Sequence, residues 1–541
     1  MRIAIAQLNF HVGNFEENSS KIINAIGKAE KENADLIVFS ELAICGYPPR
    51  DFLEFDEFIE ECLLHINNIA KHCVNIAAIV GGPSKNPSPR GKKLYNSAYF
   101  LDKGKIENVF HKTLLPNYDV FDEYRYFEPN NEFKILNFKG EKIALTICED
   151  LWNISEKLYE VDPMEELVKQ GSTLMINIAA SPFNYQQATT RQNVLKSNFK
   201  KYEVPIVYCN HSGAQTELIF DGGSLFINKN GIVEEELSYF QEDFKIIDTA
   251  SNSEKEVTVT QNKTENIHKA LVLGIQDYFR KLGFKKALLG LSGGIDSAVV
   301  FALAAEALGS ENVLGILMPS QFSSDHSVGD AKKLAHNLNA ETHTIEIEPL
   351  FSEFSSELAP VFQNLPFGLA EENLQARIRG TLLMAVSNKF GHILLNTTNK
   401  SEAAVGYGTL YGDMNGGLSV LGDLYKTEVY ELAKHINRNK EIIPLNSIIK
   451  APSAELRPGQ KDSDSLPEYD ILDKILYQYI ELRKGPEAII HQGFPEQTVK
   501  KILKMVNISE YKRHQTPPIL RVSTKAFGTG RRMPIVGKYL A

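Results

Sequence analysis

The chain has 541 residues, of which 43% are hydrophobic and 23% are charged. At about 150 residues per domain, this length corresponds to three or four domains or to two large ones. The composition is that of ordinary globular proteins and excludes wholesale disorder and fibrous repeats. With 58 Lys and Arg against 68 Asp and Glu, the net charge is -10, which disfavours nonspecific contact with nucleic acid or an anionic membrane. The sequence contains no apolar run approaching the length of a bilayer span.

The cysteines occur singly, without the paired spacing of a zinc knuckle; they are Cys45, Cys62, Cys73, Cys148 and Cys209. An odd number without CxxC pairs argues against a disulfide framework. All except Cys148 are expected to be packing residues or to have no assigned role. A strand-like alternation starts at Arg2, with no charged and then apolar leader before it. We therefore expect a soluble protein of the reducing cytoplasm.

Short apolar strands with helices between them extend to about residue 248. Strands are predicted at residues 3–6, 36–39, 76–80, 98–101, 143–147, 174–178 and 206–208. A helical pattern over residues 21–32 lies between the first two. This pattern predicts an α/β domain over residues 1–248. The stretch 249–266 is polar, lacks large apolar periodicity and is predicted to be a linker.

A second domain is predicted over residues 267–541. Ile267, Leu271 and Ile275 recur at helical spacing, and Gly283 is suited to end that helix. Beyond it, strands are expected at 287–291, 314–318, 344–347 and 393–396, with helices at 298–308, 328–338 and 373–388. This alternation indicates βαβ units on a parallel sheet. Residues 452–467 are rich in Pro, Ser, Asp and Gly, which predicts a mobile loop inside this domain.

The string Ser292-Gly-Gly-Ile-Asp-Ser297 follows a buried strand and precedes an Ala-rich helix. Adjacent glycines let the backbone approach a ligand, and N–H groups at a helix start attract an anion. Asp296 beside a phosphate requires a divalent cation between them, so magnesium is implied. A lone Ser-Gly-Gly is more often a turn with a serine helix cap. The full string after a buried strand favours a phosphate site, although it is neither GxxxxGK[ST] nor GxGxxG.

This string resembles the pyrophosphatase loop of ATP pyrophosphatases, enzymes that adenylate a substrate and release pyrophosphate. Other segments are similar to those of the NAD synthetase family: residues 396–402, 407–417, 423–427, 453–459 and 512–513. The resemblance covers most of residues 267–541. Thr398 stands where the family pattern has Gly, which predicts a stiffer turn, whereas Glu402 is in its expected place.

The resemblance also implies the site residues of the second domain. ATP would contact Gly290, Leu291, Ser292, Gly293, Gly294, Ile295, Asp296, Ser297, Leu317, Met318 and Thr397. Deamido-NAD or ATP would contact Asn373, Arg377, Glu402, Asp413, Lys426 and Lys512. Asp296 and Glu402 would hold Mg²⁺. Taken singly, each charged side chain among them could equally be a solvated surface group.

Cys148 ends the apolar strand predicted at residues 143–147. A thiol there is more often a small buried hydrophobe than a nucleophile. Glu41 and Lys112 also follow apolar segments, however, so a layered α/β fold could bring the three residues together. A carboxylate can accept the thiol proton, an ammonium can stabilise an oxyanion, and a thiolate can attack a carbonyl. The combination indicates amide hydrolysis.

The segments around these residues resemble the carbon–nitrogen hydrolase, or nitrilase, superfamily: residues 39–42, 46–48, 95–98, 111–116 and 147–152. The resemblance covers residues 1–248. It implies Glu41 as the general base, Lys112 as the oxyanion stabiliser and Cys148 as the nucleophile that forms a thioester. Glu123 would be an auxiliary acid, with an exposed loop residue as the alternative. Glutamine would contact Tyr118, Ser181 and Gln187, the last at a position where the family often has Lys.

Together the two resemblances imply one reaction in two α/β domains. An α-β-β-α carbon–nitrogen hydrolase sandwich would release ammonia from L-glutamine. A doubly wound parallel sheet, similar to adenine nucleotide α-hydrolases, would adenylate deamido-NAD with ATP and Mg²⁺, release pyrophosphate, and let ammonia displace AMP. Because ammonium cannot attack, a sheltered passage for ammonia is expected.

Three other functions remain open at this point. One is an ammonia-using ligase with a different acceptor. Another is an amidase whose second domain only senses nucleotides, and the third is a binding module with neither activity. By resemblance we expect a homo-oligomer that acts on small molecules, without nucleic-acid or membrane partners.

Overall fold

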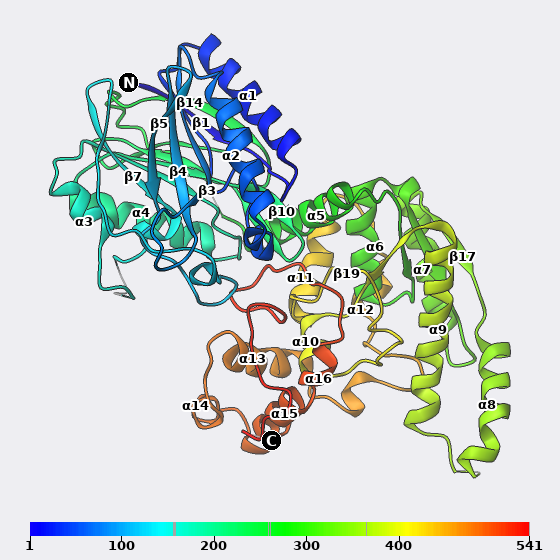
Figure 1. Cartoon of the computed structure of the whole chain (residues 1–541). Helices are drawn as coiled ribbons and strands as arrows, with labels where there is room; N and C mark the ends of the chain where they lie inside the picture. The colour runs from blue at the N-terminus through cyan, green and yellow to red at the C-terminus, as the bar shows by residue number, and fades with distance from the viewer. Residues whose placement is uncertain (155–157, 258, 260, 364, 540–541) are drawn as a thin grey trace. The chain divides into compact units, whose positions relative to one another are not determined.

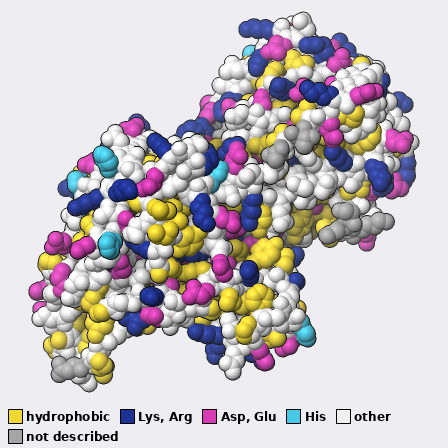
Figure 2. All heavy atoms as spheres, turned by 180° about the vertical axis from the view of Figure 1, so that it is seen from behind, with side chains coloured by type: hydrophobic (Ala, Val, Ile, Leu, Met, Phe, Trp, Pro, Cys, Tyr) yellow, Lys and Arg dark blue, Asp and Glu magenta, His cyan; other side chains and the backbone are white. Residues whose placement is uncertain are grey.

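The computed structural model describes residues 1–154, 158–257, 259, 261–363 and 365–539. The chain divides into two compact units, Met1–Gln261 and Asn262–Ala541 (Figure 1). Residues 258 and 260 of the predicted linker lie outside the described residues. Within the described ranges, we find no helix with both the length and the apolar character needed to cross a membrane. Acidic and basic side chains are intermixed on the face drawn in Figure 2.

Two six-stranded sheets form the first unit. The first sheet has the order β14-β1-β2-β3-β4-β5, and its strands are β1 (Arg2–Gln7), β2 (Leu36–Val38), β3 (Ala77–Lys85), β4 (Leu94–Asp102), β5 (Lys105–His111) and β14 (Asp243–Asp248). The second has the order β13-β12-β9-β8-β7-β6, with β6 (Leu136–Phe138), β7 (Glu141–Ile147), β8 (Leu174–Ala179), β9 (Ile206–Asn210), β12 (Leu225–Ile227) and β13 (Val233–Glu236). Strands β10 (Ser212–Gln215) and β11 (Leu218–Asp221) form a separate antiparallel pair.

Helices cover the outer faces of both sheets (Figure 1). Helices α1 (Phe15–Lys31) and α2 (Asp56–Ala70) pack their apolar sides on the first sheet. Helices α3 (Pro163–Val168) and α4 (Gln187–Tyr202) pack on the second. The predicted α-β-β-α sandwich is therefore confirmed.

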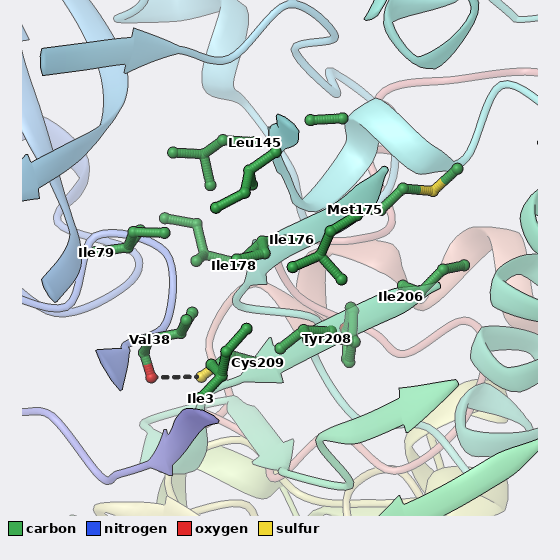
Figure 3. Packing of buried hydrophobic residues seen from close by; sticks show 14 of the residues in the cluster. Ile3, Val38, Ile79, Leu145, Met175, Ile176, Ile178, Ile206, Tyr208 and Cys209 are labelled. Atoms are coloured by element: carbon green, nitrogen blue, oxygen red, sulfur yellow. Dashed lines mark hydrogen bonds between the residues drawn. The ribbon is translucent and has the colours of Figure 1, made fainter. Parts of the chain in front are cut away.

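The inner faces of the two sheets meet in an aliphatic layer (Figure 3). Ile3, Val38 and Ile79 of the first sheet are buried in one cluster with Leu145 of the second. Alternate residues of each strand point into this layer, as expected for two packed sheets. Cys209 lies in the same layer, where its Sγ donates to the carbonyl oxygen of Val38 at 3.4 Å. Its thiol is a packing group of the core.

The predicted strands of the first unit are all present, but the edge strands, the interior strand β12 and the pair β10–β11 were not predicted. No residue of β5 is buried, and β14 buries only Ile247. Neither strand has the apolar run or the clean alternation that marks a strand in sequence. Each forms by pairing along a neighbour, β5 with β4 and β14 with β1. Helix α1 begins six residues before its predicted start, because Asn14 caps it by accepting from the N–H of Glu17.

One parallel sheet organises the second unit, with the order β17-β16-β15-β18-β19. Its strands are β15 (Ala287–Gly290), β16 (Val313–Leu317), β17 (Glu341–Thr344), β18 (Ile393–Asn396) and β19 (Leu418–Ser419). The helices that accompany it are α5 (Lys263–Leu282), α6 (Ile295–Leu308), α7 (Asp325–Leu338), α8 (Glu348–Phe362), α9 (Leu369–Phe390), α10 (Lys400–Val405), α11 (Lys426–Ile436) and α12 (Leu445–Ile449). Helices α13 (Tyr469–Ile480), α14 (Pro486–Ile490), α15 (Glu496–Ile508) and α16 (Glu510–Arg513) follow. The parallel sheet confirms the predicted fold class.

The strand predicted at residues 344–347 is wrong, because β17 ends at Thr344. This edge strand is polar and largely exposed, so its sequence lacks an apolar signal. Ile345 and Ile347 instead donate their N–H groups to Leu317 and Pro319, beyond the end of the strand ladder. Helix α5, the first helix of the second unit, ends as predicted at Gly283, which has a φ of 78°.

Candidate functional site

Cys148 lies where β7 ends and the short 3-10 helix η3 (Cys148–Leu151) begins. Its φ of 45° falls in the left-handed region, which residues other than Gly adopt rarely and mainly where function requires it. The residue is only 6% exposed. This backbone conformation favours a functional role for Cys148 over that of core filler.

Lys112, directly after β5, links two carboxylates. Its Nζ donates to Glu41 Oε1 at 2.7 Å and to both carboxylate oxygens of Glu123 at 2.9 Å. Asn96 Nδ2 donates to Glu41 Oε1 at 2.7 Å and to Glu123 Oε2 at 3.3 Å. The hydroxyl of Tyr47 donates to Glu123 Oε1 at 2.9 Å. Glu123 is therefore a buried member of this cluster, and the alternative of an exposed loop residue is wrong.

The buried charges of the cluster perturb one another. Burial raises the pKa of the Cys148 thiol and Glu41 raises it further, whereas Lys112 opposes them. Burial alone would lower the pKa of Lys112, but Glu123 and Glu41 outweigh it and hold that pKa well above its ordinary value. Burial raises the pKa of Glu123 to about 7, although Lys112 lowers it. A protonated thiol beside a carboxylate and a permanent ammonium can supply both proton transfer and oxyanion stabilisation.

Asp150, in η3, joins the chain segments that carry Lys112 and Cys148. Its Oδ1 accepts from the backbone N–H groups of Thr113 at 3.0 Å and Leu114 at 2.8 Å. Its Oδ2 accepts from the N–H of Ile147 at 2.9 Å. Burial raises the pKa of Asp150 to about 6, and these hydrogen bonds oppose the rise. No sequence pattern singles out this residue, because its contacts join distant segments.

The three residues predicted to hold glutamine form two contacts. Tyr118 donates its hydroxyl to Glu149 Oε1 at 2.8 Å, and Glu149 directly follows Cys148. Burial raises the pKa of Glu149. Gln187, at the start of α4, donates from Nε2 to Ser181 Oγ at 3.1 Å. The buried carboxylate of Glu149 is a candidate site residue that was not predicted, although its position beside Cys148 could have indicated it.

A cavity of about 260 Å³ lies at the carboxyl ends of β15, β16 and β18 in the second unit. In a parallel sheet, this edge is where ligands bind, at the point where strand order changes direction. The predicted residues that line the cavity are Gly290, Leu291, Ser292, Leu317, Met318, Thr397 and Asp413.

The predicted phosphate loop connects β15 to α6. Gly293 has a φ of 80°, and a Cβ atom there would lie 2.1 Å from the carbonyl oxygen of Ser327. Gly294 is the N-terminal cap residue of α6, and its N–H donates to Ser292 Oγ at 3.2 Å. Ser297 Oγ donates to the carbonyl oxygen of Gly294 at 3.1 Å. Glycine at 293 is required by both the backbone conformation and the close approach of Ser327.

Asp296 and Glu402, the predicted metal ligands, face the same ammonium group. Lys426 Nζ donates to Asp296 Oδ2 at 2.5 Å and to Glu402 Oε1 at 3.3 Å. Asn399 donates from Nδ2 to Asp296 Oδ1 at 2.9 Å. Burial raises the pKa of Glu402 to about 8, although Lys426 lowers it. Residues from α6, α10 and α11 thus meet in one cluster of opposite charges.

The remaining predicted contacts converge on the glycine-rich segment 406–413. Lys512 donates from Nζ to the carbonyl oxygens of Gly406 and Gly408, both at 2.8 Å. Thr409 donates from Oγ1 to Asn373 Oδ1 at 2.8 Å. Asp413 accepts from the N–H of Thr409 at 2.5 Å. Arg377 is exposed and donates from Nε to the carbonyl oxygen of Leu410 at 3.3 Å.

Thr398 fits its turn without a glycine conformation, because its φ is not positive. Its N–H donates to Asn396 Oδ1 at 3.0 Å. The departure from the family pattern therefore needs no unusual backbone geometry here.

Arg379 is a cavity residue that was not predicted. It lines the same wall of α9 as Ala376, Gly380 and Leu383, and its Nε donates to the carbonyl oxygen of Met318 at 3.0 Å. Burial lowers the pKa of Arg379 to about 10, although Glu455 raises it. The helical spacing of these residues was a signal that could have placed Arg379 on the cavity wall.

Two family descriptions match the chain. "Carbon-nitrogen hydrolase" matches residues 2–257, and "NAD synthase" matches residues 267–516. The glutamine-dependent NAD(+) synthetase of Synechocystis sp. is 49% identical over 98% of each chain. That of Thermotoga maritima is 40% identical over 100% of this chain and 99% of its own.

Solved structures agree with this assignment. The glutamine-dependent NAD+ synthetase of Acinetobacter baumannii in complex with ADP has a TM-score of 0.77 at 37% identity and covers 99% of this chain and 98% of its own. The enzyme of Cytophaga hutchinsonii has a TM-score of 0.85 and covers 99% of this chain and 98% of its own; at 22% identity it supports the fold alone. The chain belongs to the family of glutamine-dependent NAD(+) synthetases, and it is an ATP-using ligase.

Proposed function

We propose that residues 1–248 form the glutaminase and that Glu41, Lys112 and Cys148 carry its chemistry. Cys148 transfers its proton to Glu41, and its sulfur attacks the amide carbonyl carbon of L-glutamine. Lys112 stabilises the oxyanion. The proton held by Glu41 passes to the leaving nitrogen as the C–N bond breaks, giving ammonia and a thioester, which water then hydrolyses to glutamate. The observation that carries this proposal is the buried Lys112 ammonium in direct contact with Glu41.

Glutamine would be held by Tyr118, Glu149, Ser181 and Gln187. The buried Glu149 carboxylate suits the α-ammonium of an amino acid, because opposite charges attract strongly where water is scarce. Ser181 and Gln187 offer neutral polar groups, and Gln187 supplies an amide where many relatives would supply a Lys charge. Recognition of the substrate carboxylate would thus rest on hydrogen bonds at this position rather than on an ion pair.

We propose that residues 267–541, after the linker 249–266, form the synthetase and bind ATP in the cavity of the parallel sheet. Phosphates would meet the loop Gly290–Ser297, whose N–H groups stand at the start of α6. Met318 and Thr397 line the cavity beside it, and the relative from Acinetobacter baumannii binds ADP. Deamido-NAD would contact Asn373, Glu402, Asp413, Lys426 and Lys512.

The reaction proposed for this unit uses adenylation because a carboxylate oxygen is a poor leaving group. The carboxylate of deamido-NAD attacks the α-phosphorus of ATP and pyrophosphate leaves. Ammonia then attacks the carbonyl carbon of the acyl-adenylate, and AMP leaves with the former carboxylate oxygen. Lys426 and the loop N–H groups would stabilise the phosphate charges.

Asp296 and Glu402 fit a magnesium site in the chemistry of their donors. Both are carboxylates, and in this structure they share one cation, the Lys426 ammonium. The residues described contain no cluster of three His, Cys, Asp or Glu side chains suited to a metal, so phosphate oxygens and water would complete the shell, as is common for Mg²⁺. Bound there, Mg²⁺ would neutralise phosphate charge and favour departure of pyrophosphate.

Replacing Glu402 with Gln keeps the side chain's size and removes one anionic ligand. We expect the Mg²⁺ concentration for half-maximal NAD synthesis to rise on the order of 100-fold. Calorimetric titration with ATP should likewise show that Mg²⁺ strengthens binding less in the variant. Glu431→Gln, on the exposed side of α11, is the matched control. An unchanged Mg²⁺ requirement in Glu402→Gln would contradict the metal site.

We also propose that the chain forms a homo-oligomer through α8, residues 365–368 and the start of α9. Large apolar side chains are exposed there: Leu350 (40%), Phe354 (49%), Val361 (70%), Leu365 (74%), Phe367 (48%) and Leu369 (72%). Figure 2 shows apolar side chains gathered at this end of the helix pair. Contiguous apolar surface of this kind commonly marks an interface.

The double variant Leu365→Glu/Leu369→Glu should dissociate such an oligomer. Burying two carboxylates at an apolar interface costs several kcal/mol, enough to lower the affinity by more than about 100-fold. Light scattering after size exclusion should then give a smaller mass than for the parent. Leu64→Glu on α2, where Leu64 is 61% exposed, should leave the mass unchanged. Equal masses for parent and double variant would contradict the interface.

The cytoplasm is the proposed location. The five cysteines are all free and buried, which suits a reducing compartment. Cell fractionation with an antibody against the chain would test this location.

A further inference from the structure

Asn96 is a buried residue of β4 to which no part of the reaction has been assigned. Its side chain donates from a single nitrogen to Glu41 Oε1 at 2.7 Å and to Glu123 Oε2 at 3.3 Å. The residue is 1% exposed. On the strand, Asn96 pairs with Pro83 of β3, and its carbonyl oxygen accepts from the N–H of Lys112 at 2.8 Å. Its backbone is therefore fixed beside the catalytic lysine.

The two carboxylates determine which way the amide points. Rotating the amide by 180° would place Oδ1 against two carboxylate oxygens, and that contact is repulsive. In the observed orientation, Oδ1 is buried and has no partner among the residues that the structure describes. An unpaired buried acceptor is unfavourable. The site keeps this orientation because both hydrogens of Nδ2 are engaged by carboxylates.

The contacts also make the two oxygens of Glu41 different. Oε1 accepts from Lys112 Nζ and from Asn96 Nδ2, so both of its acceptor positions are engaged. Within the part of the chain that the structure describes, Oε2 accepts only from the backbone N–H of Ala180, at 3.0 Å. Among the described residues, Oε2 is the oxygen of Glu41 with an acceptor position left open.

We propose that Asn96 is a positioning residue of the glutaminase, which saturates Glu41 Oε1 together with Lys112 and so presents Oε2 to the proton of Cys148. The proposal deepens the proposed function, since it rests on Glu41 as the base. The Cys148 proton moves to Oε2 as the sulfur–carbon bond forms, and from Oε2 it moves to the leaving nitrogen. Asn96 itself touches neither the thiol nor the substrate in this scheme.

Several titratable groups surround Asn96. Glu41 follows β2, Lys112 follows β5, and Glu123 comes from the 3-10 helix η2 (Glu123–Arg125). Tyr47, Cys148 and Glu149 interact with these residues, and Asp150, Tyr118 and Tyr159 interact with Lys112, Glu123 or Cys148. Converting Asn96 to Asp would add a third carboxylate beside Glu41 and Glu123, opposite one ammonium. A protonated Asp can still donate one hydrogen bond to Glu41 Oε1, whereas an ionised Asp repels it.

Two variants test the proposal through the pH profile of glutamine hydrolysis. Asn96→Ala should lower kcat about 10- to 100-fold, the usual effect of losing a hydrogen bond to a charged group. KM should change less than about threefold. The kcat of Asn96→Ala divided by that of the parent should stay constant from pH 6 to pH 8.5. The kcat of Asn96→Asp relative to the parent should be lowest at pH 8.5. It should rise at least about tenfold toward pH 6.

Each outcome decides for or against the role. The positioning role would be overturned if the kcat of Asn96→Asp relative to the parent did not change with pH, or if the variants changed only KM. NAD synthesis from ammonium salt reports whether each preparation is folded, and equal loss of ammonium-driven and glutamine-driven synthesis would identify Asn96 as a purely structural residue. Asn228→Ala is the matched control, because Asn228 is fully buried and donates to Glu234 and Ser253 in the same unit. Glutaminase activity in Cys148→Ala would reject the proposed function itself, whatever the Asn96 variants do.

Discussion

Cys148→Ala is expected to lose NAD synthesis from glutamine by at least about 1,000-fold while NAD synthesis from ammonium salt continues. Removal of a nucleophile eliminates the covalent route completely, and only weak residual catalysis remains. The residues proposed for the synthetase reaction belong to the second unit and do not use this thiol. Measuring NAD, AMP, pyrophosphate and glutamate in the same reaction separates the two half-reactions. In the variant, glutamate should no longer form from glutamine, whereas AMP and pyrophosphate should still form with ammonium.

The matched control is Cys73→Ala. Cys73 is equally buried, and its Sγ donates to the carbonyl oxygen of Ile69, so its loss tests packing without the chemistry. Retention of glutamine-driven synthesis in Cys148→Ala would exclude this cysteine as the nucleophile. Loss of the ammonium-driven reaction as well would show that the variant damages more than the glutaminase.

Gly293→Ala is expected to lower NAD synthesis at least about 100-fold with either nitrogen source. The new Cβ would stand 2.1 Å from the carbonyl oxygen of Ser327, on a backbone with a φ of 80°. The left-handed conformation alone costs roughly 1–2 kcal/mol for a residue with a Cβ, and the collision forces the loop to move. The N–H groups proposed to bind phosphate would then leave their positions, so the KM for ATP should rise together with the fall in kcat.

Gly329→Ala provides the control, because Gly329 lies within α7 and its added Cβ would meet nothing within 4 Å. Labelling of Cys148 by an electrophilic glutamine analogue checks that the first unit of Gly293→Ala is intact. An unchanged KM for ATP and an unchanged kcat in Gly293→Ala would contradict the proposal that this loop binds the nucleotide.

The residues proposed for catalysis in the first unit could be proposed from the sequence because each follows an apolar segment. Cys148 follows β7 and Lys112 follows β5, and the ends of strands in a layered sheet converge. Glu123 was predicted as an auxiliary acid with an exposed loop residue as the alternative, since its loop has no sequence pattern that distinguishes a buried acid from an exposed one. Its burial depends on Lys112 and Tyr47, which reach it from other elements.

Asn96 and Asp150 could not be predicted as functional residues from the sequence alone. The role of Asn96 depends on the register of β4 against β3 and on the position of Lys112 beside it. Asp150 acts through three backbone N–H groups from segments far apart in the chain. In the second unit, the polar edge strand β17 was placed too late for a similar reason: pairing with β16, rather than its own composition, makes it a strand.

The carboxylate of Asp150 holds together the segment that follows Lys112 and the segment that precedes Cys148. A neutral amide in its place has one acceptor oxygen and could not receive the same N–H groups from both segments. Motion that carried Cys148 away from Lys112 would have to break these three hydrogen bonds to a buried side chain, and their loss opposes it. A single side chain thus restrains the separation of the segments that carry the thiol and the ammonium.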